Sequence, residues 1–189
     1  MSNIVIINDR VHIQPIIKEI ESRFKDWHRI SNIKGVGGKV ETTNFLPLSM
    51  AVVKPGVDIK SVEETMHTPF YQVYVKTVKW LKSVNCGHHS RAAFIRLTPG
   101  SSNNTHIDEG NYYQSRDRYH LALMGKYRYV VGEEEMIVHP GTFFWFNNKI
   151  SHASYNIDVV DRIALVFDVP HGPNNPHHGV LNKPVVDLI

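Results

Sequence analysis

The sequence contains a single cysteine, Cys86, among 189 residues. One thiol excludes an intramolecular disulfide and every zinc site built from several cysteines, and it fits a reducing compartment. Long hydrophobic runs are also missing. The N-terminal apolar run, Ile4 to Ile7, is too short for a signal-peptide core or a membrane span. We therefore expect a cytoplasmic protein that does not associate with a membrane.

Blocks of like charge are absent as well. The formal net charge is only +3, and the lysines and arginines are scattered along the chain. Nucleic-acid-binding domains usually concentrate basic residues on one face or in one segment, so no nucleic-acid partner is predicted. The length and the hydrophobic content of 42% fit one globular domain with a sizeable core.

The first 87 residues have the pattern of a mixed α/β support region. Ile4 to Ile7 is expected to form a short buried strand, and apolar residues recur at helical spacing after Pro15. Ser61 to Glu64 has the capping-box pattern that opens a short helix. Thr68-Pro69 supplies an N-cap and a first-turn proline for one longer helix.

After Gly87 the pattern changes to short apolar or alternating runs separated by glycine and proline turns. Residues 88–170 are therefore expected to form an antiparallel sandwich or barrel. Residues 171–189, rich in Pro, Gly, Asn and His, are expected to form an extended tail. The predicted strands are Ala92–Leu97, Tyr119–Leu123, Tyr127–Val131, Met136–Val138, Thr142–Phe146, His152–Asn156 and Arg162–Asp168.

Three residues form a candidate metal-binding set. His106 and Asp108 are two positions apart, so in an extended segment their side chains point to the same side. His152 begins another predicted strand. Two imidazoles and one carboxylate are the ligands of non-heme iron(II) oxygenases, although zinc or manganese also suits them. A His-x-Asp pair arises often by chance, and His152 could equally be a buried histidine satisfied by the backbone.

Arg162 adds a second chemical signal. Alternation along its strand places Arg162, Ala164 and Val166 on one face. The other face then carries Ile163, Leu165 and Phe167. A guanidinium among apolar residues requires an anionic partner, because a buried unpaired charge is costly. A dicarboxylate such as 2-oxoglutarate would match its planar two-pronged donor. The alternatives are a salt bridge to Asp161 or Asp168, or exposure at the strand end.

Further polar residues are candidates for the wall of the same site. Arg118 and His120 share one face of a predicted strand, and Tyr127 and Tyr129 share a face of the next. The segment after the first ligands could form a lid over a substrate, or be an ordinary surface loop. The candidate substrate contacts are Asn111, Tyr112, Trp145 and Asn147, of which Trp145 could equally belong to the core.

In order and spacing, these elements resemble the aspartyl/asparaginyl beta-hydroxylase family of iron(II)- and 2-oxoglutarate-dependent oxygenases, from about Ala92 to Val169. The residues that carry the resemblance are Arg96 to Gly100, His106 to Asp108, Arg118 to Leu121, Pro140 to Asn148, Ser151 to Ala153 and Arg162 to Val169. The resemblance implies a double-stranded beta-helix (a cupin-like jelly roll) with iron on His106, Asp108 and His152. It also implies Arg162 on the distal carboxylate of 2-oxoglutarate, with Arg118 and His120 helping to hold this cosubstrate.

Two positions depart from parts of that family. Some members lack the carboxylate ligand, whereas Asp108 is present here, and this favours hydroxylation over halogenation. Some members carry a cosubstrate-binding serine where this chain has Ile95. A nucleic-acid demethylase would share the three ligands, but that class usually has a second arginine six residues after the first, where Asp168 stands here.

The predicted function is that of a dioxygenase using iron(II), 2-oxoglutarate and O2. It would hydroxylate an amino-acid-like substrate, either a free amino acid or an Asp, Asn or Pro side chain of a protein, and release succinate and CO2. The partner is therefore a small-molecule or peptide substrate. The alternative is a metal-binding cupin of non-oxygenase activity, such as an isomerase or a ligand-binding module. A purely structural sandwich would leave the joint occurrence of His106, Asp108, His152 and Arg162 unexplained.

Overall fold

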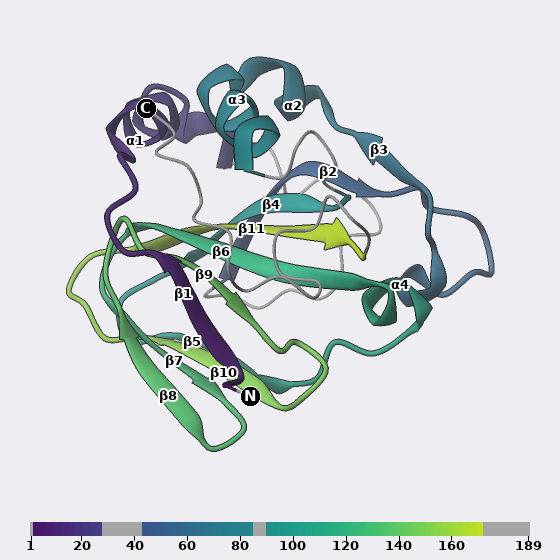
Figure 1. Cartoon of the computed structure of the whole chain (residues 1–189). Coiled ribbons are helices and arrows are strands. Elements are labelled where there is room, and N and C mark those ends of the chain that lie inside the picture. Colours follow the sequence, from purple (N-terminus) through teal and green to yellow (C-terminus); the bar gives the residue numbers. More distant parts are fainter. Residues whose placement is uncertain (1, 28–42, 85–89, 172–189) are drawn as a thin grey trace.

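The chain forms two antiparallel β-sheets, with helices packed on the outer face of the larger one (Figure 1). The computed structural model describes residues 2–27, 43–84 and 90–171. Cys86, the predicted loop at residues 35–38, the predicted helix end at residues 85–87 and the tail beyond residue 171 lie outside these ranges.

The larger sheet has seven strands and the smaller has four, and every pairing among the described residues is antiparallel. In spatial order, the larger sheet contains β1 (Ile4–Asn8), β9 (Phe143–Phe146), β6 (Arg116–Met124), β11 (Arg162–Pro170), β4 (Ala92–Leu97), β2 (Thr43–Ala51) and β3 (Thr65–His67). The smaller sheet contains β5 (Ser102–His106), β10 (His152–Asn156), β7 (Tyr127–Val131) and β8 (Glu134–Val138).

The path of the chain between the sheets defines the fold. From β4 onward it passes repeatedly from one sheet to the other, so β4, β6, β9 and β11 face β5, β7, β8 and β10. Eight antiparallel strands wound in this way form a jelly roll. The predicted double-stranded β-helix is therefore confirmed. In Figure 1 the larger sheet lies between the helices above it and the smaller sheet below it.

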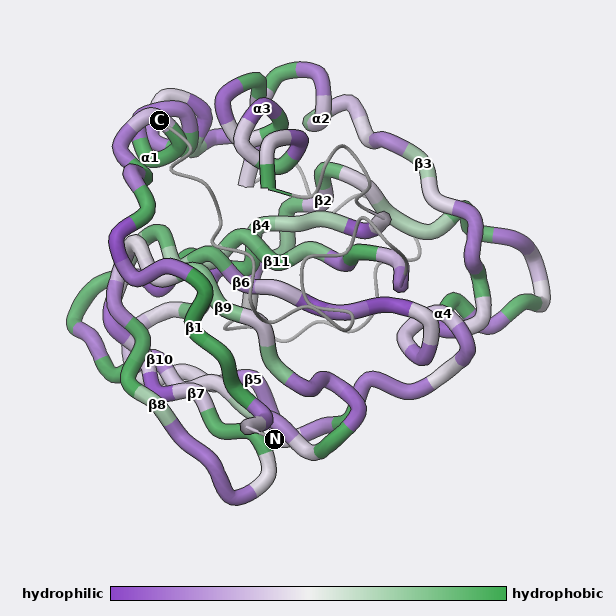
Figure 2. The backbone as a smooth tube through the Cα atoms, viewed as in Figure 1, coloured by the Kyte–Doolittle hydropathy of each residue, from purple (hydrophilic) through white to green (hydrophobic). Residues whose placement is uncertain are grey.

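Alternation along the strands separates two hydrophobic clusters. Ile163, Leu165 and Phe167 of β11 face outward and pack with the helices through residues such as Ile16 and Leu81. The inner cluster between the sheets contains Ala122, Tyr127, Tyr129, Val131, Val138, Phe144 and Phe146. Figure 2 shows β1, β4 and β11 running mostly in the hydrophobic colour, whereas the turn joining β7 to β8 is hydrophilic. The predicted two faces of β11 are therefore confirmed.

The helices are α1 (Gln14–Ser22), α2 (Pro69–Val73), α3 (Val75–Val84), α4 (Asn111–Gln114) and the 3-10 turn η2 (Ile59–Ser61). The Thr68 hydroxyl accepts a hydrogen bond from the Phe70 N–H, as an N-cap should. Tyr74 leaves the helical conformation, so the predicted single helix is divided into α2 and α3. The capping-box prediction at Ser61 is wrong, because Asp58 caps η2 and Ser61 ends it.

The N-terminal region does more than support the barrel. Ile4 of β1 pairs with Phe146 of β9, and β2 pairs with β4 along most of its length. Strands β2, β3 and β5 were not among those predicted. Within the described ranges, no helix is long and apolar enough to cross a membrane.

Candidate metal centre

His106, Asp108 and His152 converge at one end of the space between the sheets. Each offers a ligand atom, and these atoms lie within 4.8 Å of one another. The ring centroids of the two histidines are 4.3 Å apart, because His106 at the end of β5 pairs with His152 at the start of β10. His152 and Asp108 are buried, whereas the side chain of His106 is 46% exposed. The three residues could therefore hold one metal ion that solvent or a substrate reaches from the His106 side.

Backbone carbonyls fix the orientation of both imidazoles. Nδ1 of His106 lies 2.7 Å from the carbonyl oxygen of Asn104, and Nδ1 of His152 lies 2.9 Å from that of Ile150. A carbonyl oxygen only accepts, so each Nδ1 carries the proton and each Nε2 keeps a free lone pair. This arrangement is the usual second layer of support around metal-binding histidines. Burial also lowers the pKa of His152, which favours the neutral form that binds metals.

Asp108 is held through one of its two oxygens. Its Oδ2 accepts hydrogen bonds from Nη1 of Arg118 at 2.7 Å and from Nδ2 of Asn148 at 3.0 Å. Burial raises the pKa of Asp108, but Arg118 and His152 outweigh this effect and hold the pKa below its ordinary value. Asp108 is therefore a carboxylate at neutral pH, and its Oδ1, 3.9 Å from Nε2 of His106, accepts no hydrogen bond from the described side chains.

Arg162 is completely buried, and none of its three guanidinium nitrogens has a hydrogen-bond partner among the described residues. Both salt bridges considered for it are absent. Asp161 accepts a hydrogen bond from Arg96 at 2.7 Å, and Asp168 is paired with Arg118 at 2.7 Å. The guanidinium lies 4.2 Å from the ring centroid of Tyr127. Within the described part of the chain, Arg162 is thus a buried cation without an anionic partner.

Three other polar atoms between the sheets are buried without a hydrogen-bond partner among the described residues. They are His120 Nδ1, the Tyr127 hydroxyl and the Ser154 hydroxyl. Burial and the nearby Arg162 hold the pKa of His120 well below its ordinary value, so this ring is neutral. His120 and Ser154 line a cavity of about 40 Å³ together with His106 and His152. Unpaired polar groups therefore lie beside the three candidate ligands.

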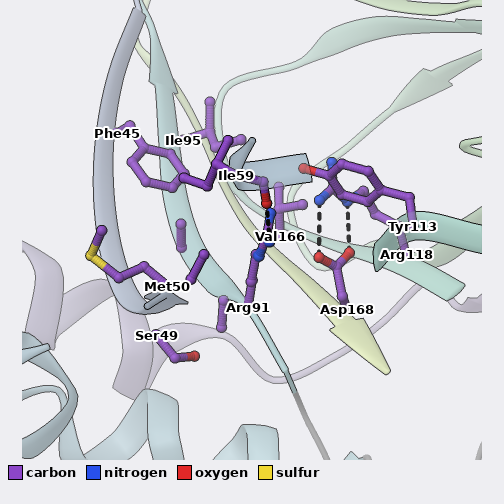
Figure 3. Close-up of a pocket in the computed structure, with 13 residues that line it drawn as sticks. Phe45, Ser49, Met50, Ile59, Arg91, Ile95, Tyr113, Arg118, Val166 and Asp168 are labelled. Carbon is purple, nitrogen blue, oxygen red and sulfur yellow. Dashed lines mark hydrogen bonds and ion pairs between the residues drawn. The ribbon is translucent and has the colours of Figure 1, made fainter. Parts of the chain in front are cut away.

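A larger pocket of about 300 Å³ adjoins this cavity (Figure 3). Ile95, Arg118 and Val166 line both spaces. The pocket lies over the inner face of β2, β4 and β11, and Figure 3 shows Arg118 and Asp168 paired at one of its ends. Ile95 contributes an apolar wall and no side-chain hydrogen-bond donor.

The predicted substrate residues lie elsewhere. Tyr112 is fully buried, and its hydroxyl donates to Asp168 and accepts from the Arg91 N–H. Trp145 packs on the outer face of the large sheet and donates from Nε1 to Asp117, whereas Asn147 donates to Asn3. Asn111 is exposed at the start of α4. None of the four lines either cavity, so their contact with a substrate stays a prediction.

Three residues of the site were not predicted from the sequence. Asn148 holds Asp108, Asp168 holds Arg118, and Arg91 lines the larger pocket. Asp168 had a usable signal, because alternation places it on the same face of its strand as Arg162. Asn148 follows a strand, and Arg91 precedes one, so neither has a periodic pattern that reveals it.

The fold and the three converging ligands define a jelly-roll protein with a candidate mononuclear metal centre. The profile of the family described as aspartyl/asparaginyl beta-hydroxylase matches residues 18–172, well over half of the chain. The protein therefore belongs to the aspartyl/asparaginyl beta-hydroxylase family. The match also extends through the N-terminal half, where no resemblance was predicted.

More distant similarities come from solved structures. A predicted oxalate decarboxylase from Thermotoga maritima is 19% identical, with a TM-score of 0.39 over 48% of this chain and 74% of that one. A cupin-superfamily sugar phosphate isomerase from Silicibacter pomeroyi is 18% identical, with a TM-score of 0.35 over 43% of this chain and 50% of that one. The Cnp3 cupin domain of Schizosaccharomyces pombe is 13% identical, with a TM-score of 0.38 over 50% of this chain and 65% of that one. No curated protein matches the chain.

Proposed function

We propose that the protein is an iron(II)- and 2-oxoglutarate-dependent dioxygenase that hydroxylates an amino-acid-like substrate. The substrate is a free amino acid or an Asp, Asn or Pro side chain of a protein, and succinate and CO2 are released. The observation that carries the proposal is Arg162, a completely buried guanidinium with free donors in the space that also holds the three candidate ligands. A cytoplasmic location, which the single cysteine favours, belongs to the proposal.

The donor set fits iron(II). His106 and His152 would bind it through Nε2 and Asp108 through Oδ1, because the other atoms of these groups are engaged by Asn104, Ile150, Arg118 and Asn148. Two imidazoles and one carboxylate leave open positions for a chelating cosubstrate and oxygen. When bound, iron supplies oxygen activation coupled to oxidative decarboxylation of 2-oxoglutarate. The residues of the chain fix the positions of the ligands and exclude water.

Arg162 supports 2-oxoglutarate as the cosubstrate. Burial of a guanidinium without a partner has a desolvation penalty on the order of several kcal/mol. Binding of a carboxylate at Arg162 is therefore strongly favoured. The unpaired hydroxyls of Tyr127 and Ser154 offer further donors. We expect a dicarboxylate to place one end on the metal and the other on Arg162. His120, neutral and unpaired at Nδ1, supplies one more polar contact.

Arg118 supports the site in a different way from the one that the family resemblance implies. Its Nη1 bonds to Asp108, and its Nε and Nη2 bond to Asp168. Burial lowers the pKa of Arg118, but the two carboxylates outweigh it and raise the pKa well above its ordinary value. We assign Arg118 the role of positioning Asp108, and its contact with the cosubstrate stays a prediction.

The second candidate is a metal-binding cupin without oxygenase activity, either an isomerase or a ligand-binding module. Such a protein would use the three ligands but has no need of a free buried cation on the same inner surface. Arg162 therefore favours the oxygenase.

The test is succinate formation. Purified protein with iron(II), 2-oxoglutarate and O2 should produce succinate, detected by NMR, even without a prime substrate, because these enzymes turn over slowly when uncoupled. His152→Ala should abolish this turnover, whereas the exposed His139→Ala should not change it. If neither the wild-type protein nor the His139 variant produces succinate, the non-oxygenase cupin is favoured.

A further inference from the structure

The pocket of about 300 Å³ beside the metal centre has its own chemical character. It shares Ile95, Arg118 and Val166 with the cavity at His106 and His152, so the pocket adjoins the candidate metal centre. Its volume is at the lower end of the range for small-molecule sites, roughly 300–1,000 Å³. It suits a small ligand better than a folded protein partner.

Most of the wall is apolar. Phe45 and Met50 of β2, Ile59 of η2, and Ile95 of β4 surround the pocket, and Val166 of β11 lies at its centre in Figure 3. Besides Arg118, the residues that the pocket shares with the metal cavity are Ile95 and Val166, and both are apolar. A bound ligand would therefore have an apolar body.

One cation in the wall is not neutralised. Arg91 donates through Nη2 to the backbone carbonyls of Ile59 and Val62, which are neutral acceptors. Its Nε is buried without a partner, and no carboxylate pairs with it among the residues that the structure describes. Its guanidinium stacks on the Tyr112 ring at 3.6 Å, which holds the group in place. Figure 3 shows the side chain rising toward the backbone of Ile59.

The other charges of the pocket cancel locally. Arg118 and Asp168 form a two-pronged ion pair, with distances of 2.7 and 3.0 Å, and Asp168 also accepts from Tyr112. The hydroxyl of Tyr113, which Figure 3 shows at this end of the pocket, is one further donor. The pocket is therefore apolar with an excess of positive charge at Arg91, and it is complementary to an anion with an apolar body.

We propose that this pocket binds the substrate, and that the substrate is a small carboxylic acid with an apolar body whose carboxylate is held by Arg91. An aliphatic amino acid and the corresponding acid without an amino group share this chemistry. The assignment of the ligand as substrate rests on the proposed function, whereas its binding in the pocket does not. The two are therefore tested separately.

The test is isothermal titration calorimetry of metal-free protein with 4-methylpentanoate, 4-methylpentanamide and L-leucine. The acid should bind, and the neutral amide of the same shape should bind about 10- to 100-fold more weakly, because a charge-assisted hydrogen bond is lost. Arg91→Gln should weaken binding of the acid by a similar factor. Tighter binding of L-leucine than of the acid identifies the amino acid as the better ligand, and weaker binding of L-leucine identifies the acid without an amino group.

Three controls locate the site. Arg162→Gln removes the other unpaired arginine and should leave binding of the acid unchanged. Ala93→Leu fills the pocket while keeping the arginine at position 91 and should weaken binding, so the test stands even if Arg91→Gln misfolds. Arg128→Gln, on an exposed arginine paired with Glu135, should have no effect. Equal binding of acid and amide, no binding of the acid, or loss of binding in the Arg162 variant instead of the pocket variants would overturn the proposal.

Discussion

Arg118 and Asp108 form a buried ion pair in which Nη1 of the arginine lies 2.7 Å from Oδ2 of the carboxylate. The pair leaves Oδ1 of Asp108 for a metal and directs the remaining donors of Arg118 to Asp168. A residue that the family resemblance associates with the cosubstrate thus holds a candidate metal ligand.

Arg118→Gln should weaken metal binding about 10- to 100-fold, because outer contacts that orient a ligand carry this much of the affinity. Mn(II) titration followed by electron paramagnetic resonance measures the affinity without oxygen chemistry. Arg128→Gln serves as the matched control. Unchanged Mn(II) affinity, combined with weaker 2-oxoglutarate binding, would contradict the positioning role and restore the cosubstrate role.

Arg162→Met should change ligand binding and stability in opposite directions. The variant should bind 2-oxoglutarate much more weakly in the presence of Mn(II), because the distal carboxylate loses its cation. The metal-free protein should become more stable by about 1–4 kcal/mol, because an unpaired buried charge is replaced by an apolar side chain of similar volume. Urea unfolding measures the second effect. A destabilised variant would show that Arg162 has a partner in the folded protein.

Stability of the metal-free protein should fall as the solution becomes acidic. Burial and Arg162 hold the pKa of His120 well below 6.5, so the unfolded chain binds a proton that the folded chain does not. The stabilising contribution of the neutral ring is complete above pH 6.5 and is lost progressively below it. His120→Gln should reduce the slope of the free energy of unfolding against pH by up to about 1.4 kcal/mol per pH unit. The same substitution at the exposed His139 should leave this slope unchanged. Identical slopes in the two variants would contradict this prediction.

Tyr112→Phe should destabilise the protein by about 1–3 kcal/mol, because it removes a hydroxyl that bonds to two buried partners. The hydroxyl donates to Asp168 at 3.1 Å and accepts from the Arg91 N–H at 2.9 Å. Tyr113→Phe is the matched control, since its hydroxyl faces the pocket, and it should change the free energy of unfolding by less than about 0.5 kcal/mol. Equal losses in urea unfolding would argue against a structural role for Tyr112.

The strands that the sequence predicts best are those with clear apolar or alternating patterns. The bounds of β4, β7 and β10 agree with the predicted ranges, since each run is bounded by turn residues. Strand β5, Ser-Asn-Asn-Thr-His, has no apolar residue and was missed. It lies at the edge of the smaller sheet, where pairing with β10 alone holds it in place.

Parts of the site could also be predicted from the sequence, because their signals lie within one strand or one short segment. Alternation alone places Arg162 and His120 on inner faces, and the spacing of His106 and Asp108 places two ligands together. The pairing of Arg118 with Asp168 depends on the register of β6 against β11, which joins residues 50 positions apart. Periodicity within one strand contains no information about register between strands. For this reason the role of Arg118 emerges only from the structure.

The most direct test of the central claim is an anaerobic titration of the purified protein with iron(II) and 2-oxoglutarate. Chelation of the metal by the 2-oxo acid should give a weak visible charge-transfer band that requires both components and disappears in His106→Ala. In Arg162→Met, the band should form only at much higher 2-oxoglutarate concentration. Iron bound without any such band, at any 2-oxoglutarate concentration, would contradict the assignment of this protein as a 2-oxoglutarate-dependent hydroxylase.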